Sequence, residues 1–375
     1  MTAFDTIRAQ FPVTEHWIYL NHAAACPIPL AAREAMTKRI EDQTRNGTVN
    51  HDRWSTDYER VRRLAAKLVH AETEQIAFIQ NTSDGVSTVA GGITWQAGDN
   101  IVLPEIEFPS NFYAWRQLEH KGVEVRLVSA PNGYAAVDDL RAAMDSKTRL
   151  VALSYVQFSS GYRYPLSTIA TLCREIGALL FVDGTQAVGA LEIDVTDSGI
   201  DILAVSAHKW MLGPLGIGFS CFSSRALEAI FPPRLGWLSV ENPFDFDYQL
   251  RLPKDASRFE AGTENAVGIA GLGGTLDIIF SLGPKAIEDR VLALTDHLEE
   301  GLRLRGLDII SPREREQRSG ILSARPREED PANILARREQ AGILCSVRNG
   351  GIRFSPHYYN SYAELHVALK QLDSS

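Results

Sequence analysis

The sequence predicts an α/β protein, with a mainly parallel, doubly wound sheet in a large domain and a smaller α+β domain. Short apolar runs alternate with helical periodicity between residues 76 and 230, which is the pattern of βαβ units. The runs at 179–182 and 202–205 are bounded by polar or glycine residues, as strands buried on both faces are. A chain of 375 residues can bury a large core and form two domains. We expect residues 20–265 to form the large domain, and residues 1–19 and 266–375 the small one.

The expected elements follow one another in chain order. The strands are the apolar runs at 76–79, 101–103, 123–128, 150–156, 179–182, 202–205 and 216–222. Helical spacing predicts helices at 54–70, 86–90, 112–119 and 165–177, and two more within 266–306. The segment Leu282–Pro284 separates those two, and the glycine cluster at 271–274 indicates close helix packing in the first of them.

Composition excludes several classes of function. Hydrophobic residues make up 45% of the chain and charged residues 23%, which is ordinary for a globular protein. A formal net charge of -9 argues against a nucleic-acid or membrane-surface partner. The four cysteines are widely spaced, so we expect neither a metal site nor a disulfide framework. The amino terminus lacks a signal-peptide core, and no run approaches the roughly 20 apolar residues of a membrane span, so we expect a cytoplasmic protein.

Polar side chains follow two of the expected strands. Asp183 and Gln186 come after the 179–182 strand, and Ser206, His208 and Lys209 end the 202–205 strand. Because ligands in open α/β sheets bind at the carboxyl ends of strands, one site could hold all five. An isolated Asp or Lys would more often cap a loop or face solvent. Together, a carboxylate and a lysine suit pyridoxal phosphate, since the acid keeps its ring nitrogen protonated and the amine forms a Schiff base with its aldehyde.

The segments 183–186 and 206–214 resemble the cofactor segment of the class V aminotransferase family, which holds cysteine desulfurases, selenocysteine lyase, kynureninase and isopenicillin epimerase. The resemblance extends over nearly the whole chain in five ordered segments, at 19–25, 81–85, 183–213, 258–265 and 351–360. It implies fold type I of the pyridoxal enzymes and pyridoxal 5'-phosphate as the cofactor. It also implies that Lys209 and Asp183 are the catalytic residues, with Lys209 as Schiff-base residue and then general base.

The same resemblance assigns further residues to the site. Thr82 and Ser83 lie at an expected helix start, where hydroxyls ordinarily cap the helix but can also hold a phosphate. Phe108 stands where the family often has a histidine stacked on the ring, and Arg353 would clamp a substrate carboxylate. The implied cofactor-binding residues are Thr82, Ser83, Phe108, Gln157, Asp183, Gln186, Ser206, His208, Lys209, Gly262 and Thr263. The implied substrate-binding residues are Asn21, His22, Ala23 and Arg353.

The segment 258–265 resembles a loop that reaches the partner's cofactor phosphate in the family's dimers, although Glu264 replaces the usual proline. The resemblance therefore implies a homodimer with shared active sites, in which each site borrows Gly262 and Thr263 from the other chain.

For the reaction, we expect a class V aminotransferase-like enzyme acting on an amino acid or keto acid. The alternatives are a carbon–sulfur or kynureninase-type lyase, an amino-acid epimerase, or a protein that only binds, which the intact Asp183 and Lys209 disfavour. A desulfurase needs a thiolate on a mobile loop before the carboxylate-binding arginine, and residues 347–351 leave no room for that loop. Cys345 falls in an expected strand at 343–347, as a packed thiol. We therefore expect no desulfurase that acts through a thiol nucleophile.

Overall fold

The computed structural model describes residues 3–372, and its main feature is a seven-stranded sheet in the order β2-β8-β7-β6-β5-β3-β4. The strands are β2 (Ile76–Ile79), β3 (Asn100–Pro104), β4 (Glu124–Val128), β5 (Thr148–Ser154), β6 (Leu179–Asp183), β7 (Ile202–Ser206) and β8 (Gly218–Phe222). Neighbours from β7 through β6, β5 and β3 to β4 are parallel, whereas β8 is antiparallel to both β7 and β2. The prediction of a mainly parallel sheet in an α/β protein is confirmed.

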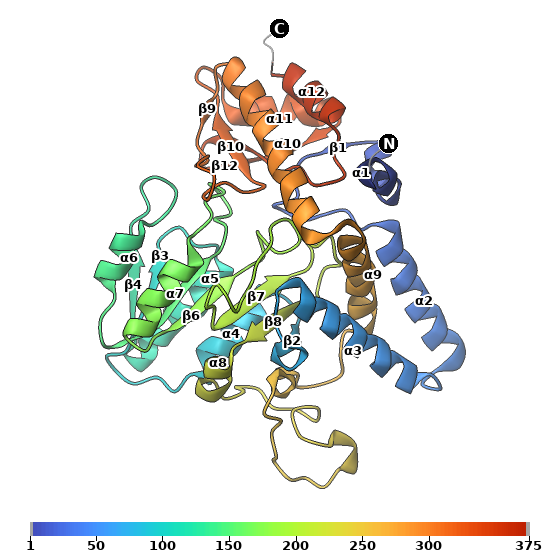
Figure 1. The fold of residues 1–375 in the computed structure, drawn as a ribbon, viewed down its shortest axis with the longest axis vertical. Coiled ribbons are helices and arrows are strands. Elements are labelled where there is room, and N and C mark those ends of the chain that lie inside the picture. The colour runs from blue at the N-terminus through green and yellow to red at the C-terminus, as the bar shows by residue number, and fades with distance from the viewer. Residues whose placement is uncertain (1–2, 373–375) are drawn as a thin grey trace.

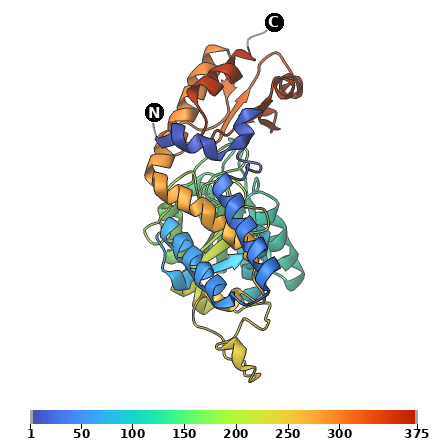
Figure 2. The ribbon, with the colours of Figure 1, turned by 90° about the vertical axis from the view of Figure 1, so that its right-hand side faces the viewer.

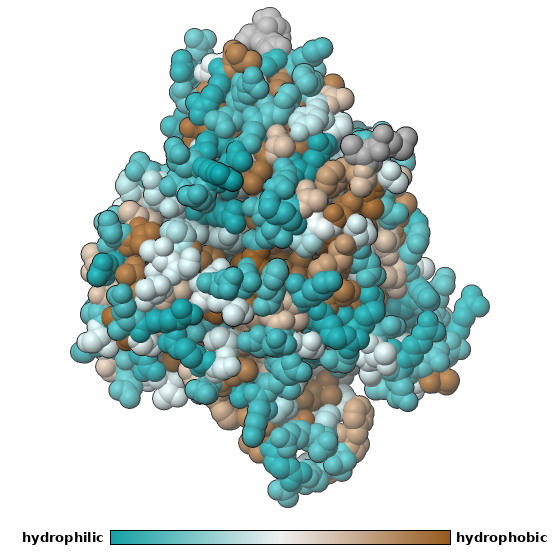
Figure 3. Space-filling model, viewed as in Figure 1, coloured by the Kyte–Doolittle hydropathy of each residue, from teal (hydrophilic) through white to brown (hydrophobic). Residues whose placement is uncertain are grey.

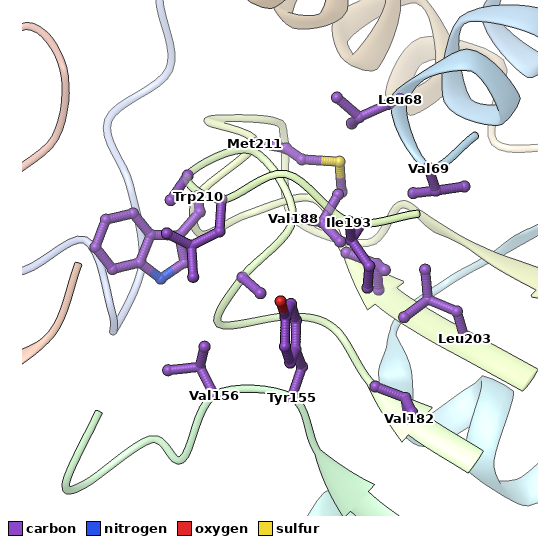
Figure 4. Packing of buried hydrophobic residues seen from close by; sticks show 14 of the residues in the cluster. Leu68, Val69, Tyr155, Val156, Val182, Val188, Ile193, Leu203, Trp210 and Met211 are labelled. Atoms are coloured by element: carbon purple, nitrogen blue, oxygen red, sulfur yellow. The ribbon is translucent and has the colours of Figure 1, made fainter. Parts of the chain in front are cut away.

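Both faces of this sheet are covered, as the continuous apolar runs indicated. In β6, Leu179 and Phe181 pack on one face, and Leu180 and Val182 on the other. Helices α4 (Thr82–Gly92) and α5 (Ser110–Arg116) cover the first face, and α6 (Val137–Ala143) and α7 (Leu166–Glu175) the second. Figure 4 shows part of the hydrophobic core on this second face, where Val182 and Leu203 lie near side chains of the loops that follow the strands. Packing against the core therefore holds these loops in place at the ends of the strands.

Further helices lie beside the sheet (Figure 1). They are α2 (Leu30–Asn46), α3 (His51–Leu68) and α9 (Ala266–Leu282). A Cβ on Gly274 of α9 would lie 2.8 Å from the Ala31 carbonyl oxygen, so only glycine allows α2 and α9 to pack this closely. The predicted role of this glycine cluster in helix packing is confirmed.

The carboxyl part forms a separate four-stranded sheet in the order β12-β13-β10-β9. The strands are β9 (Asp308–Ile309), β10 (Leu322–Arg325), β12 (Ser346–Arg348) and β13 (Gly351–Phe354), and α10 (Pro284–Leu304), α11 (Pro331–Gln340) and α12 (Tyr362–Lys370) accompany them. Near the amino terminus, after α1 (Ala3–Ile7), β1 (Ile18–Tyr19) pairs with β11 (Ile343–Leu344). Figures 1 and 2 show this part above the large sheet, joined to it by α10.

The β12–β13 hairpin closes with a two-residue turn. Asn349 and Gly350 have φ angles of 49° and 70°, which an Asn-Gly pair adopts readily in tight hairpins. The expected strand at 343–347 is interrupted at Cys345, whose buried thiol lies 3.9 Å from an Arg338 nitrogen. Residues 347–351 thus join the two strands directly.

After α8 (Ser224–Ala229), the segment 231–253 projects from the body of the protein (Figures 1 and 2). It exposes large apolar side chains, and in the space-filling view the lower end shows apolar and hydrophilic residues side by side (Figure 3). Within residues 3–372 no single helix is long and apolar enough to cross a membrane; the pair α9 and α10 meets that test only together, across an 82° bend.

Candidate active site

A cavity of about 430 Å³ opens at the carboxyl ends of β6 and β7. Register aligns Asp183, the last residue of β6, with Ala204 of β7, so the residues that follow β7 meet Asp183 at one edge of the sheet. The cavity is the place where the predicted site residues converge. Those in its wall are Ala23, Thr82, Ser83, Phe108, Asp183, Gln186, Ser206, His208, Lys209 and Arg353.

Lys209 and Asp183 are oppositely charged groups of the cavity wall that influence each other's pKa. Burial lowers the pKa of Lys209 to about 8; Asp183 opposes this shift, and Arg353 adds to it. Burial raises the pKa of Asp183, whereas the Thr185 backbone amide, which donates to its carboxylate at 2.9 Å, lowers it. A neutral amine is therefore accessible on Lys209 near physiological pH, which a lysine nucleophile requires.

One end of the cavity is lined by hydroxyl groups at the start of α4. Thr82 Oγ1 lies 2.6 Å from Thr185 Oγ1 and 2.9 Å from Ser206 Oγ, and Ser83 Oγ donates to Ser110 Oγ at 2.8 Å. The Thr82 amide donates to the same Ser206 oxygen. Hydroxyls beside a helix N-terminus, where backbone NH groups and the helix dipole favour anions, fit the phosphate of pyridoxal phosphate.

Part of the cavity wall is aromatic. Phe108 and Phe158 meet edge to face, with ring centroids 5.3 Å apart and planes at 76°. Lys209 Nζ lies 5.0 Å from the Phe108 centroid. Phe108, which Phe158 supports edge to face, offers a flat apolar surface beside the lysine, as a pyridine ring requires.

Gln157 lies behind that wall rather than in it. Its side chain is fully buried, and its amide nitrogen donates to Glu107 at 2.6 Å. Burial raises the pKa of Glu107 to about 7, against the lowering effect of hydrogen bonds from Ser154 and Asn111. Glu107 and Gln157 directly precede Phe108 and Phe158, so their hydrogen bond ties together the two loops that carry the aromatic pair.

Asn21 and His22 also lie outside the cavity wall, whereas Ala23 forms part of it. The two ring nitrogens of His22 are engaged by the Ser355 carbonyl and the Tyr359 hydroxyl, each at 2.7 Å. Burial and the neighbouring His357 lower the pKa of His22, so it is a neutral packing residue.

Gln186 holds the Ala23 segment in place. Its amide nitrogen donates to the Ala23 carbonyl and its oxygen accepts from the Trp210 indole, both at 2.9 Å. His208 is half-buried next to Lys209, and burial lowers the pKa of its imidazole. Both side chains line the cavity, but the amide of Gln186 already forms hydrogen bonds with Ala23 and Trp210.

Arg353 is held in a fixed orientation on β13. Its Nη1 donates to the Phe158 carbonyl at 2.6 Å and its Nε to Ser346 Oγ at 3.2 Å. Its Nη2 is buried and has no partner among the described residues. A buried guanidinium with a free nitrogen at a cavity is an anion site, and burial together with Arg348 lowers the pKa of Arg353 to about 9.

Comparisons with known proteins agree with this geometry. The family profile described as Aminotransferase class-V matches residues 18–366. This protein belongs to the class V aminotransferase family. A probable cysteine desulfurase from Methanothermobacter thermautotrophicus is 31% identical over 98% of this chain and 97% of its own length.

Two solved structures are similar over almost the whole class V chain. The apo cysteine desulfurase from Thermococcus onnurineus NA1 superposes with a TM-score of 0.90 at 26% identity, covering 99% of this chain and 97% of that one. A variant of C-DES with glycine covalently linked to its PLP cofactor gives a TM-score of 0.91 at 23% identity, covering 98% and 99%. The fold is therefore fold type I, and the cofactor of this class V protein is pyridoxal phosphate.

The functional expectation, which excluded a cysteine desulfurase that acts through a thiol nucleophile, is wrong, and the expected aminotransferase-like enzyme is supported only as a member of the class V family. Relatives that match this class V chain over almost its whole length include proteins named cysteine desulfurases. The two-residue turn at Asn349 and Gly350 is present as expected. The shortness of this one turn, however, is weaker evidence about the reaction than sequence similarity that extends over 98% of the chain.

Gly262 and Thr263 do not reach the Lys209 cavity of their own chain. They line a different hollow of about 400 Å³, with Glu260 and Asn265. Their assignment to a partner's site stays a prediction.

The cavity wall also includes residues that the sequence argument did not single out. Phe158 and Arg348 each stand close in sequence to a predicted residue, and Thr185 lies inside the motif at 183–186, so proximity to a motif was the available signal. For Ser110 the chain offers no such signal beyond a hydroxyl two residues after Phe108.

Proposed function

We propose that this protein is a pyridoxal-phosphate-dependent enzyme of the cysteine desulfurase type. It would cleave the bond between Cβ and sulfur in a cysteine-derived amino acid. Cβ would keep the bonding electron pair and take a proton, which gives alanine, and with cysteine as substrate the sulfur would pass to an acceptor thiol as a persulfide. The observation that carries the proposal is the free, buried Nη2 of Arg353 at the cavity that also contains Lys209 and Asp183. Sulfur as the leaving atom is supported by the names of the relatives.

Each residue has a role that follows from its surroundings. Arg353, fixed by Phe158 and Ser346, would bind the substrate α-carboxylate and so orient the bonds at the α-carbon. Lys209, with its pKa near 8, would take the α-proton and return a proton during the reaction. When bound, the cofactor supplies an electron sink for the pair released at the α-carbon.

The protein groups around the cofactor site would position the cofactor and help its ring to accept this electron pair. Asp183 is a buried carboxylate that can hold a proton on the cofactor's ring nitrogen. Phe108, supported edge to face by Phe158, would cover a face of the ring, and the hydroxyls of Thr82 and Ser83 would hold its phosphate.

The proposal includes a homodimer. Thr263 is exposed in the single chain and lies in a hollow away from Lys209, which is the placement expected if it serves a partner's site.

Product analysis tests the reaction. The holoenzyme is incubated with L-cysteine, L-cysteine sulfinate and a panel of other amino acids, with and without a keto acid, and products are identified by mass. We expect alanine and an equal amount of released sulfur from a cysteine-derived substrate. Lys209→Ala should abolish both, whereas Lys285→Ala, at an exposed lysine, should keep them. Amino-group exchange with keto acids and no sulfur release would overturn the proposal.

A further inference from the structure

Glu107 is a buried carboxyl group directly before Phe108, behind the aromatic part of the cavity wall. Its two oxygens accept four hydrogen bonds from the part of the chain that the structure describes. The Ser154 amide and hydroxyl donate at 2.9 and 2.6 Å, the Gln157 side-chain nitrogen at 2.6 Å and the Asn111 side-chain nitrogen at 2.9 Å. Because all four partners present a hydrogen atom, these surroundings suit a carboxylate better than a protonated acid.

Glu107 is not balanced by a cation within residues 3–372, where no basic side chain forms an ion pair with it. The titratable groups of these residues that act on its charge are Asp183 and Tyr164. Burial raises the pKa of Glu107 to about 7 and Asp183 adds to the rise, whereas the hydrogen bonds lower it. A buried charge held by hydrogen bonds alone makes folding less favourable, and such groups concentrate at functional sites.

The groups that donate to this carboxylate belong to segments that build the site. Ser154 ends β5 and pairs in register with Asp183 of β6. Gln157 precedes Phe158, and the Phe158 carbonyl accepts from Arg353 Nη1 at 2.6 Å. One carboxylate is therefore connected to the strand end beside Asp183 and, through a single peptide unit, to the anion-binding arginine.

We propose that ionised Glu107 is a positioning residue for substrate binding. Through Gln157 it fixes the Phe158 carbonyl, which in turn holds the Arg353 guanidinium in the orientation that receives the α-carboxylate. The Gln157 amide depends on this contact, because its buried oxygen has no hydrogen-bond partner among the described residues. The inference rests on the proposed function, because that function places the α-carboxylate on Arg353.

The charge of Glu107 is essential to this role. The Gln157 nitrogen donates a strong, charge-assisted hydrogen bond to a carboxylate, and protonation of the acid weakens or reverses that bond. With a pKa of about 7, native Glu107 is protonated at lower pH and ionised at higher pH. The advantage of the native protein over Glu107→Gln should therefore be small at about pH 6 and fully present at about pH 8. A role in packing alone would not depend on pH.

Ligand titration tests the assignment without turnover. The holoenzyme forms of the native protein and of Glu107→Gln are titrated with L-alanine, and each dissociation constant is taken from the change in cofactor absorption. The ratio of the two constants removes the titration of the ligand's own amino group, which is common to both. We expect Glu107→Gln to bind L-alanine about tenfold more weakly at about pH 8 and nearly as well as the native protein at about pH 6. A ratio that is equal at the two pH values, or no weakening at the higher one, would overturn the inference.

The matched control is Asp201→Asn, at the opposite end of the sheet, directly before β7. Asp201 is also a buried carboxylate that accepts from a backbone amide and a serine hydroxyl, those of Leu180 and Ser223, each at 3.0 Å. Unlike Glu107, it pairs with an arginine, Arg225, at 3.2 Å. Asp201→Asn should leave the L-alanine constants unchanged at both pH values.

Gln157→Met tests the same connection from its other end, and it keeps the inference testable if Glu107→Gln does not fold. It preserves the bulk of the side chain and removes the amide. L-alanine binding should weaken at about pH 8 to a similar extent, and the double variant should bind no more weakly than the weaker single variant. Additive losses would show that Glu107 and Gln157 act separately, which contradicts the proposal.

Unfolding of the apoprotein tests whether the buried group carries a charge. A carboxyl group whose pKa is raised in the folded state lowers the stability as the pH rises from its ordinary pKa to the raised one. The denaturation midpoint of the native protein should therefore fall relative to that of Glu107→Gln between about pH 5 and about pH 8. Parallel profiles would show that Glu107 has an ordinary pKa in the folded protein and would overturn the inference.

The two proposals can fail separately. Sulfur release together with a pH-independent ratio of L-alanine constants rejects only the role of Glu107. A pH-dependent ratio in a protein that releases no sulfur rejects only the reaction.

Discussion

Lys209 is a largely desolvated basic group of the cofactor site, and burial is the main cause of its lowered pKa. Its ammonium loses hydration in the cavity, and two arginines repel it, while Asp183 supplies the opposing attraction. The balance lowers its pKa to about 8, so its neutral, nucleophilic form is accessible near physiological pH. The positions of Asp183, Arg348 and Arg353 therefore control how readily the lysine captures the cofactor.

This balance predicts a pH dependence for cofactor capture by the apoprotein. The rate should rise with pH through a midpoint near 8, because the neutral amine is the reactive form. Asp183→Asn removes the attraction that raises the pKa of Lys209, so its midpoint should lie lower than the native one. Stopped-flow absorbance measures both profiles. Asp277→Asn, at an exposed carboxylate, is the control and should leave the midpoint in place. A native midpoint near the ordinary lysine value, or an upward shift in Asp183→Asn, would contradict this account.

At this scale the sequence predicted residues that belong to a contiguous motif. Asp183, Ser206 and Lys209 were accessible because polar residues directly follow apolar runs. The contact between the hydroxyls of Thr82 and Thr185 was not accessible, because these residues meet at 2.6 Å although they are 103 positions apart in the chain. Gln157 was predicted to bind the cofactor but does not line the cavity. It directly precedes the cavity-wall residue Phe158, and this position in the sequence does not reveal that its amide points toward Glu107.

Helix α4 connects a local sequence signal to the phosphate end of the site. Asn81 caps it, and the Asn81 side chain accepts from the Asp84 amide at 3.1 Å. The cap fixes the first turn, where Thr82 and Ser83 line the cavity. Helix α8 has an equivalent cap, in which Ser223 accepts from the Ala226 amide at 3.2 Å, but it lies away from the cavity.

The two caps give a matched pair of variants. Asn81→Ala and Ser223→Ala should each lower the free energy of unfolding by about 1 kcal/mol. Only Asn81→Ala should also weaken pyridoxal phosphate binding, because it loosens the turn that holds the phosphate. Chemical denaturation of the apoprotein and equilibrium cofactor titration give the two quantities. Equal cofactor affinity in both variants would show that α4 does not position the phosphate.

The central strands β6 and β7 of the large sheet were predictable because each is a bounded apolar run that is buried on both faces. Helix α2 escaped prediction for a physical reason. Of its 17 residues only Ala32 is buried, so it has little apolar periodicity, and its place depends on the small residues of α9. Such packing is a tertiary property that local spacing does not reveal.

For the whole molecule, the proposal to be tested is that two chains build each site. A side chain on Gly262 would meet no atom within 4 Å, so the chain itself tolerates a larger residue there. Any loss of activity on substitution at this position would then arise outside the single chain. Thr263, its exposed neighbour, lies in the same hollow.

Hybrid dimers test the shared site. Inactive Lys209→Ala chains are mixed with chains that carry Gly262→Val and Thr263→Val, and differential tags isolate the hybrid. If Thr263 serves the partner, one site of the hybrid collects both defects and the other has none, so about half of the native activity per dimer should return. If Thr263 served its own chain, every hybrid site would carry one defect and activity would stay absent. A monomeric mass in solution would reject the shared site directly.

The central claim is that Lys209, in the cavity at the ends of β6 and β7, holds the cofactor. Borohydride reduction of the holoenzyme, followed by peptide mass mapping, tests it most directly. We predict a cofactor-derived mass increase on the peptide that contains Lys209, and none on that peptide in Lys209→Ala. A reduced cofactor attached to any other lysine would contradict the assignment of the site.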